Sequence, residues 1–442
     1  MNMLLSVISA IVTGFVFIFP KFNFLCFFSF IPLMYNIEKN NCSFKSGFLY
    51  GFFIHILSMM FVLTMHPLDF LGINKKLSLV LVVFAYIAIC LIEGIFFGVL
   101  FYLFKKYVKS IWIFPLFYAG VEFVLGLGTL GLTFSDLYLV FYENILFIQS
   151  AGLFSGYFIT VIVLYINLFI MKAIFDKKLF IFPALIIFVV NISYGYLNIN
   201  YFYNDIDLKQ TISLIQGNIS SNDKWQINDK YKILNEYESL TLDAIKNDNA
   251  DVVIWPETVV PVSIDENHNI YKEISDFAKE NNIHIITGAF IKENNHSYNS
   301  IIVFNDDGIS YDERYDKRHL IPFAEYNPFT DNKIKSGEEA TVIETKFGKI
   351  GGLVCIDSAY PYLAYQTLKN DPDFLVVLSN DSWFKSSFGV YNHNAHSVFR
   401  AIESKKYVLR CANSGITNII KPTGESIKKI LPDRKGYITY EK

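Results

Sequence analysis

Three side chains in the second half of the sequence have the chemistry for acyl transfer. Glu257 ends the strand-like run DVVIWPE, Cys355 ends GGLVC, and Lys317 lies in YDKRHLIPFAEY. Strand ends and loops are where α/β folds usually place reactive groups. A thiol with a pKa of about 8.5 is mostly protonated at neutral pH, so a carboxylate must take its proton during attack or a cation must lower its pKa. Glu257 can do the first and Lys317 the second.

The tetrahedral intermediate of acyl transfer also needs hydrogen-bond donors at its oxyanion. The Lys317 ammonium and the backbone N–H of Ile356, directly after the thiol, are the candidates. Each residue also has an ordinary structural explanation: an ion pair for Glu257, a buried apolar site for Cys355 and a solvated surface for Lys317. We interpret Cys411, inside an apolar run with no matching base motif, as a buried hydrophobe. No CxxC motif or Cys/His cluster indicates a metal.

The elements that position these residues follow from an uneven composition. The chain has 442 residues, 52% of them hydrophobic and 18% charged, with a mean hydropathy of +0.34. Through residue 204 there are 11 Lys, no Arg and 7 acidic residues, whereas 27 basic and 34 acidic residues follow. This contrast predicts two domains, 1–204 and 205–442. Neither has the positive excess that phosphate binding uses, which excludes a basic nucleic-acid binder.

The first domain contains seven apolar stretches of about the length that crosses roughly 30 Å of hydrocarbon. They lie near residues 3–19, 22–37, 47–65, 77–104, 111–128, 152–174 and 179–198. With the N-terminus in the cytoplasm, the inner loops hold eight lysines and the outer loops three, as the positive-inside rule requires. The sequence therefore predicts a multi-pass protein of the bacterial inner membrane, with residues 205–442 on its outer face.

The second domain alternates short β-branched runs with helical patterns, which predicts an α/β domain. The strand-like runs are TISLIQGN, ADVVIWPE, IHIITGAF, NSIIVF, KIGGLVCID, DFLVVLSND and KYVLRCANSG. One helical pattern runs through Tyr231, Leu234, Tyr237, Thr241 and Ala244.

Taken in order, these motifs resemble the nitrilase superfamily, and the apolar half in front resembles its membrane-embedded branch, the apolipoprotein N-acyltransferase family. The matching motifs are WPE, the Lys of DKRHLIPFAEY, the Cys of GGLVCID, QGN followed by KW, YNS, NDSWF, HNAHSVFRAIE and NSGIT. The resemblance implies an α-helical transmembrane bundle followed by an α-β-β-α sandwich.

The resemblance also implies a ping-pong reaction. Cys355 would take an acyl chain from a membrane phospholipid as a thioester and pass it to the α-amino group of the N-terminal diacylglyceryl-cysteine of an apolipoprotein. Glu257 would be the general base and Lys317 the oxyanion stabiliser, with Glu325 as a second glutamate that positions Lys317 or assists proton movement. Two supporting residues, Trp225 and Asn299, match family positions near the active site. A thioester is already activated relative to an amide, so no cofactor is expected.

The chain departs from the family pattern at three places. Ile356 and Asp357 follow the nucleophile where many members have an aromatic residue and a Glu. Leu125 stands where an Arg usually follows the glutamate matched by Glu122. No apolar stretch follows the soluble domain, although many members have a terminal helix.

An aromatic segment, SWFKSSFGVY, places Trp383, Phe384 and Phe388 in an expected loop. Such residues suit a bilayer interface, and we expect them to guide acyl chains to Cys355 unless they simply pack beneath the loop. Two other functions remain open: a membrane-anchored amidase that hydrolyses a small amide, and a transporter or receptor without enzymatic activity. The preferred lipid and the oligomeric state do not follow from the sequence.

Overall fold

The computed structural model describes residues 2–39, 44–68, 72–127, 131–202, 207–220, 224, 230–265, 268–308, 310, 313–322, 325, 326 and 334–442. The chain forms two compact units. The first comprises Met1–Gly126, Gly131–Tyr203 and Ser387–Ala395, and the second comprises Leu127–Leu130, Asn204–Ser386 and His396–Lys442. The segment Ser387–Ala395, which lies within the second domain expected from the sequence, thus groups with the first unit.

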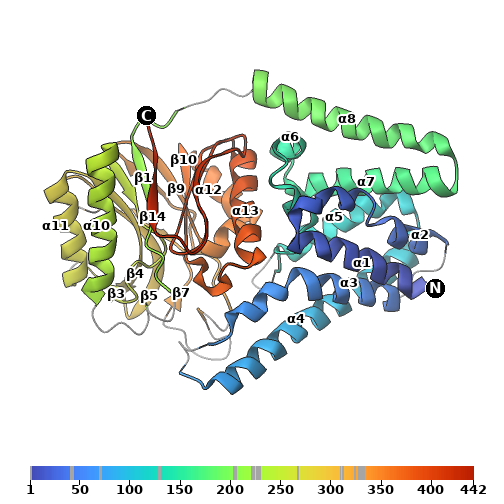
Figure 1. Ribbon diagram of the computed structural model, residues 1–442, viewed down its shortest axis with the longest axis horizontal. Coiled ribbons are helices and arrows are strands. Elements are labelled where there is room, and N and C mark those ends of the chain that lie inside the picture. The colour runs from blue at the N-terminus through green and yellow to red at the C-terminus, as the bar shows by residue number, and fades with distance from the viewer. Residues whose placement is uncertain are drawn as a thin grey trace. The chain divides into compact units, whose positions relative to one another are not determined.

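The first unit is a bundle of apolar helices (Figure 1). Its α-helices are α1 (Asn2–Ile18), α2 (Ile31–Lys39), α3 (Phe44–Ser58), α4 (Lys75–Leu103), α5 (Phe114–Leu125), α6 (Ile145–Ile148), α7 (Gly156–Phe175) and α8 (Ile181–Leu197). Among the described residues, three helical runs are long and apolar enough to cross a membrane: Lys75–Val108, Gly156–Phe175 and Lys178–Tyr201. Two shorter apolar helices cover Met3–Ile18 and Ile111–Leu125. The expected transmembrane bundle is confirmed, whereas the count of seven crossings stays a prediction.

One expected crossing is not a single helix. The stretch 22–37 is divided between a 3₁₀ helix, Pro20–Phe27, and α2. Irregular backbone at membrane depth must find internal partners for its N–H and C=O groups. Asn167 of α7 supplies such partners, accepting a hydrogen bond from the Phe30 N–H at 3.0 Å and donating one to the Cys26 carbonyl at 2.7 Å.

Glu122 of α5 has a similar structural role. Its carboxylate accepts a 2.7 Å hydrogen bond from the Leu137 N–H, at the start of the 3₁₀ helix Leu137–Phe141, and another of 2.7 Å from the Thr160 hydroxyl of α7. A carboxylate with two donors is much less costly inside a bundle than an unpaired one. Glu122 therefore fastens an irregular segment to two helices.

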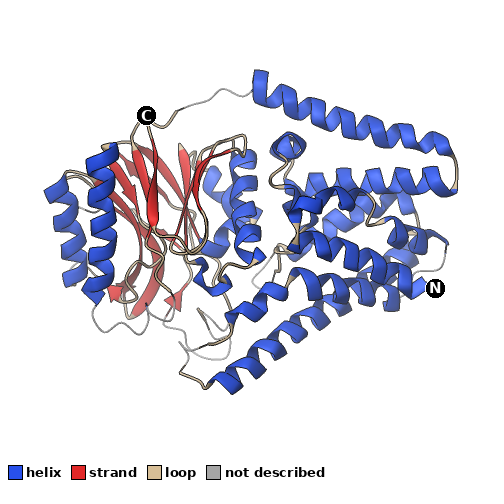
Figure 2. Ribbon diagram, viewed as in Figure 1, coloured by secondary structure: helices blue, strands red, loops and turns tan. Residues whose placement is uncertain are grey.

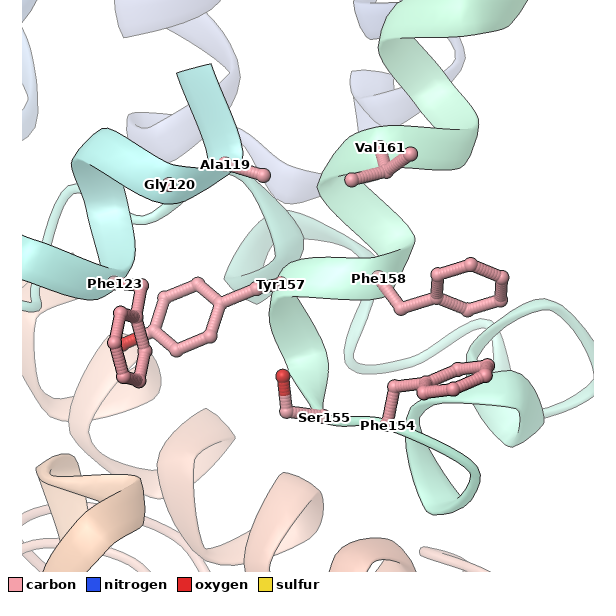
Figure 3. A pocket seen from close by; sticks show the side chains of 8 residues that line it. All are labelled: Ala119, Gly120, Phe123, Phe154, Ser155, Tyr157, Phe158 and Val161. Carbon is pink, nitrogen blue, oxygen red and sulfur yellow. The ribbon is translucent and has the colours of Figure 1, made fainter. Parts of the chain in front are cut away.

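An apolar hollow of about 400 Å³ lies between α5 and α7 (Figure 3). It is lined by Ala119, Gly120, Phe123, Phe154, Ser155, Tyr157, Phe158 and Val161. This lining offers no carboxylate, ammonium or thiol.

The second unit contains two stacked sheets between helices (Figure 2). In the described part of the chain, the first sheet has the order β14 (Gly436–Tyr440), β1 (Ile212–Gln216), β2 (Val252–Ile254), β4 (His284–Glu293), β5 (His296–Phe304) and β6 (Tyr315–Asp316), with β3 (Ser263–Ile264) beside β4 and β7 (Ile334–Lys335) beside β5. The second has the order β13 (Ser426–Ile430), β12 (Thr417–Ile420), β11 (Val408–Ala412), β10 (Phe374–Ser379), β9 (Gly348–Val354) and β8 (Val342–Thr345). All seven strand-like runs of the sequence form strands.

Two hydrophobic cores hold these layers together. One lies between the sheets, where Leu214 and Ile254 of the first meet Val354 and Leu378 of the second. The other packs α10 (Lys230–Asp248) and α11 (Asn269–Asn281) against the first sheet. The helices α12 (Pro361–Leu368) and α13 (Phe388–Ser404) follow β9 and β10. The expected α-β-β-α sandwich is confirmed.

Candidate active site

The candidate base, oxyanion stabiliser and nucleophile come from two sheets. Glu257 follows β2, and Lys317 directly follows β6, both in the first sheet. Cys355 directly follows β9 in the second. Strands β1, β2 and β4 run parallel to one another, as do β9, β10 and β11. Glu257 and Cys355 therefore lie beyond the carboxyl ends of two parallel strands, β2 and β9. Packing the sheets face to face thus brings chemistry from both into one site.

Lys317 lies between two glutamates. Its Nζ is 2.7 Å from Oε1 of Glu325 and 3.5 Å from Oε1 of Glu257. Asn299, on β5, donates hydrogen bonds to the same two oxygens, at 2.8 Å to Glu257 and 3.4 Å to Glu325. The Lys317 ammonium is 1% exposed, and the second oxygen of Glu325 accepts the Ile321 N–H at 2.9 Å. The ammonium is therefore fixed by charge and by the geometry of its partners.

The nucleophile sits on a strained turn. Cys355 has a φ of 53°, in the left-handed region that residues other than glycine rarely adopt. The strand ends at Val354, and Cys355 opens the 3₁₀ helix Cys355–Ala359. Such strain is typical of functional turns and persists only where surrounding contacts enforce it.

Asp357 provides those contacts. Its buried carboxylate accepts hydrogen bonds from the Val354 N–H at 3.1 Å, the His319 N–H at 2.9 Å and the Tyr315 hydroxyl at 2.8 Å. Val354 precedes the nucleophile, whereas Tyr315 and His319 flank Lys317. Asp357 therefore ties the nucleophile turn to the lysine segment, which gives a structural role to one of the positions where the sequence departs from the family pattern.

Glu257 also lies on a tight turn. Its neighbour Thr258 has a φ of 43°, and a Cβ atom on Gly288 of β4 would lie only 2.7 Å from the Glu257 Cα. The turn thus rests directly against the backbone of β4, and only glycine leaves room for it.

Charges and burial set the protonation states of this site. Burial raises the pKa of the Cys355 thiol, and the Glu257 carboxylate raises it further, while the Lys317 ammonium opposes them. Burial alone would lower the pKa of Lys317, but the carboxylates of Glu325 and Glu257 outweigh it and raise the pKa above its ordinary value. The resting site therefore holds a neutral thiol beside a charged lysine and needs a base at the moment of attack.

A second buried cation was not among the candidates from the sequence. Lys224, which is 1% exposed, places its Nζ 3.3 Å from the Glu257 carbonyl oxygen and 3.4 Å from the Thr258 hydroxyl. Burial lowers its pKa to about 8, and the charge of Glu257 acts in the opposite direction. In the sequence, Lys224 belongs to the KW pair that follows QGN, and only Trp225 of that pair was predicted to lie near the active site.

The remaining candidates have different positions. Trp225 lies outside the described residues. Ile356 occupies the first turn of the 3₁₀ helix after Cys355, where N–H groups have no partner within the helix. Trp383 and Phe384 are partly buried in the 3₁₀ helix Asp381–Phe384. Phe388 begins α13 instead of lying in a loop, and its ring packs edge-on against Phe61 at 5.7 Å within the first unit.

Two further motifs hold the loops after β1 and β11 in place. Asn413 of NSG accepts hydrogen bonds from the Tyr237 hydroxyl at 2.9 Å and the Ile219 N–H at 3.1 Å. Gln216 of QGN accepts one from the Thr417 hydroxyl at 2.6 Å. These polar residues join the two sheets at the site.

Comparison with known proteins agrees with this architecture. Residues 211–441 match the carbon-nitrogen hydrolase family, and residues 9–169 match the apolipoprotein N-acyltransferase N-terminal domain. An apolipoprotein N-acyltransferase of Aquifex aeolicus is 29% identical over 444 residues, covering 96% of this chain and 94% of the relative. One from Geobacter metallireducens is 28% identical over 336 residues, or 70% of this chain.

This chain spans 64% of the Geobacter relative, less than two thirds of its length. Among solved structures, the Saccharomyces cerevisiae nitrilase-superfamily protein Nit3 has a TM-score of 0.44 and 22% identity, covering 54% of this chain and 92% of that one. The helical half in front of the hydrolase match is similar to the N-terminal domain of apolipoprotein N-acyltransferases. Because the hydrolase match covers more than half of the sequence, the chain belongs to the carbon-nitrogen hydrolase family.

Proposed function

We propose that this protein moves an acyl chain from a membrane phospholipid to the α-amino group of the N-terminal diacylglyceryl-cysteine of apolipoproteins. The observation that carries the proposal is the buried arrangement of Glu257, Lys317 and Cys355, in which the first two act electrostatically on the sulfur of the third. The apolar helical unit and the relatives named above support a lipid donor and a lipoprotein acceptor.

In the first half-reaction, the Cys355 thiol gives its proton to Glu257 while the sulfur attacks the acyl ester carbonyl of the phospholipid. The Lys317 ammonium and the Ile356 N–H stabilise the oxyanion. The intermediate collapses when the lysophospholipid oxygen leaves and takes the proton from Glu257. The product is a thioester on Cys355.

In the second half-reaction, the acceptor amine attacks the thioester and gives a proton to Glu257. The sulfur leaves and recovers that proton, so the thiol is restored and an amide is formed. Asn299 and Glu325 position the two charged groups throughout. We place Trp225 beside this site and assign Trp383, Phe384 and Phe388 to guiding the acyl chain. No cofactor enters either step.

The same proposal places the protein in the bacterial inner membrane with the catalytic unit on the outer face. The lysine bias of the expected loops supports this orientation. Both substrates lie in the bilayer, so attachment to membrane helices keeps the reactive thiol near them.

The decisive experiment is intact-protein mass measurement after incubation with phospholipid. Wild-type protein should gain one acyl mass, and Cys355→Ala should gain none. Cys411→Ala is the matched control, because its thiol is fully buried between the sheets and donates to the Ile215 carbonyl at 3.2 Å. Acylation of the Cys355→Ala protein would refute the proposal.

A diacylglyceryl lipopeptide should then discharge the acyl-enzyme and gain the acyl group. Ammonia released from a small amide without acylation of the lipopeptide would instead identify an amidase.

A further inference from the structure

Ser379 lies beside the nucleophile at the end of the neighbouring strand. Strands β9 and β10 are parallel with Val354 paired to Leu378, so Cys355 and Ser379 follow paired positions. The Ser379 hydroxyl is fully buried, and the register of the two strands places it next to Cys355, where a hydrogen bond from it lowers the pKa of the thiol. None of the roles above uses this hydroxyl.

The hydroxyl has a second partner on its other side. Its Oγ lies 2.7 Å from Oδ1 of Asp381, which is 1% exposed. An ionised carboxylate only accepts hydrogen bonds, and a serine hydroxyl has a single hydrogen to give. In the resting site, the hydrogen of Ser379 therefore points to Asp381, and the thiol of Cys355 donates to Oγ.

Asp381 is itself held rigidly. Its second oxygen is 2.7 Å from Nη2 of Arg410, and both side chains are completely buried. A Cβ atom on Gly415 would lie 2.0 Å from that oxygen, so the carboxylate packs against bare backbone. Because the guanidinium remains as a partner, Asp381 can lose the Ser379 hydrogen bond without becoming unpaired.

We propose that Ser379 is a positioning residue whose hydroxyl hydrogen turns from Asp381 to the Cys355 sulfur when the thiol loses its proton. The S–H proton goes to Glu257, no other covalent bond changes, and the hydroxyl now donates to the thiolate. The same rotation recurs when the thioester breaks and the sulfur leaves. Asp381 thus holds the Ser379 hydroxyl in place, and Arg410 holds Asp381. The hydroxyl stabilises negative charge on the sulfur only when that charge develops.

This inference rests on the proposed nucleophilic role of Cys355, but not on the identity of the acyl donor or acceptor. The charged groups that act on the sulfur are Glu257, Lys317 and Asp381. Two of them are negative and disfavour a thiolate. Removing the hydroxyl therefore leaves the repulsion between Asp381 and the thiolate without the opposing hydrogen bond from Ser379.

The test is the rate of alkylation of Cys355 by iodoacetamide in the full-length protein, measured on its peptide by mass spectrometry from pH 6 to 10. Below the thiol pKa this rate is proportional to the thiolate fraction. Ser379→Ala should slow alkylation about tenfold, as expected for the loss of a hydrogen bond to a charged atom. If Ser379→Ala acted only by reducing the side-chain volume, it would open the site and make alkylation faster. Slower alkylation therefore indicates loss of the hydrogen bond, and faster alkylation indicates loss of volume.

A second pair keeps the side-chain volume constant. Ser379→Thr retains the hydroxyl and Ser379→Val lacks it, although both have nearly the same shape. The Thr variant should react about tenfold faster than the Val variant. Equal rates in this pair, or faster alkylation of Ser379→Ala, would overturn the proposal.

Ser213→Ala is the control for loss of a buried hydroxyl elsewhere in the unit. Its Oγ lies 2.8 Å from the Thr439 hydroxyl, between β1 and β14, and its removal should leave alkylation unchanged. Melting curves identify any variant that fails to fold. If Ser379→Ala fails to fold, the comparison of Ser379→Thr with Ser379→Val tests the proposal, and if either of those fails, the comparison of Ser379→Ala with wild type does so. Because alkylation needs no phospholipid, a wild-type protein that forms no acyl-enzyme refutes the proposed function without affecting this result.

Discussion

The amide of Asn299 donates a 2.8 Å hydrogen bond to Oε1 of Glu257. Lys317 approaches that same oxygen at 3.5 Å. Among the described residues, no side chain or backbone group donates to Oε2. Oε1 therefore orients the carboxylate, and the proposed mechanism assigns acceptance of the thiol proton to Oε2.

Glu257→Gln should separate proton transfer from thiol acidity. Loss of the base should slow acyl-enzyme formation by about 10²–10⁴-fold. The thiol pKa should fall, because the negative charge that raises it is gone, so alkylation by iodoacetamide below that pKa should become faster. Rapid-quench mass measurement and alkylation rates report the two effects. The control Glu344→Gln, at an exposed carboxylate, should change neither. Slower alkylation in Glu257→Gln would contradict this assignment of charge.

Glu325→Gln should change the alkaline limit of activity. The Glu325 carboxylate helps to raise the pKa of Lys317, and oxyanion stabilisation needs the charged ammonium. Removing that charge lowers the Lys317 pKa, so the ammonium deprotonates at a lower pH than in the wild type. The rate of acyl-enzyme formation should therefore begin to fall at a lower alkaline pH than in the wild type. At pH 7 the variant should lose less of that rate than it loses at alkaline pH. A pH profile with an unmoved alkaline limb would show that Glu325 does not act through Lys317.

Asp357→Asn should destabilise the nucleophile turn. The amide NH₂ would face backbone N–H donors that the carboxylate now satisfies, and each unpaired buried donor costs about 1–3 kcal/mol. We expect a lower melting temperature together with loss of acyl-enzyme. Asp371→Asn, at a side chain that is 92% exposed, is the matched control and should leave both quantities unchanged. Wild-type stability in Asp357→Asn would argue against this role.

Gly288→Ala should displace Glu257, the proposed base, without changing its carboxylate. The new methyl group meets the Glu257 Cα and the Pro256 carbonyl at 2.7 Å, which forces the turn away from β4 at a cost of about 1–3 kcal/mol. Acyl-enzyme formation should fall at least tenfold in the mass assay. Gly120→Ala, where a Cβ atom has no neighbour within 4 Å, should be silent. Full activity in Gly288→Ala would mean that the turn tolerates movement.

Much of the soluble fold was predictable because its strands are short runs bounded by polar residues. The inward face of α10 also followed from its periodicity, since Leu234, Tyr237, Thr241 and Ala244 are buried. Tyr231 is 40% exposed, and Ile233 takes its place on that face. A helical pattern in the sequence predicts the buried face of a helix more reliably than it predicts the first residue of that helix.

The supporting residues of the site were less accessible to sequence reasoning. Asp357 reaches Tyr315 across 42 residues of chain, and Ser379 meets Cys355 only through the register of two strands. Lys224 is buried although lysine is ordinarily a surface residue. Such contacts depend on tertiary packing, which local patterns do not contain. The order of the motifs predicted Glu257, Lys317 and Cys355 as the reactive groups, and that assignment stays a prediction.

Reactivity in this protein is a property of two sheets together, since base and lysine belong to one and sulfur to the other. Before those sheets assemble, Cys355 has neither Glu257 nor Lys317 beside it. On the proposed mechanism, assembly of the two sheets is therefore the step that creates the acyl-transfer site.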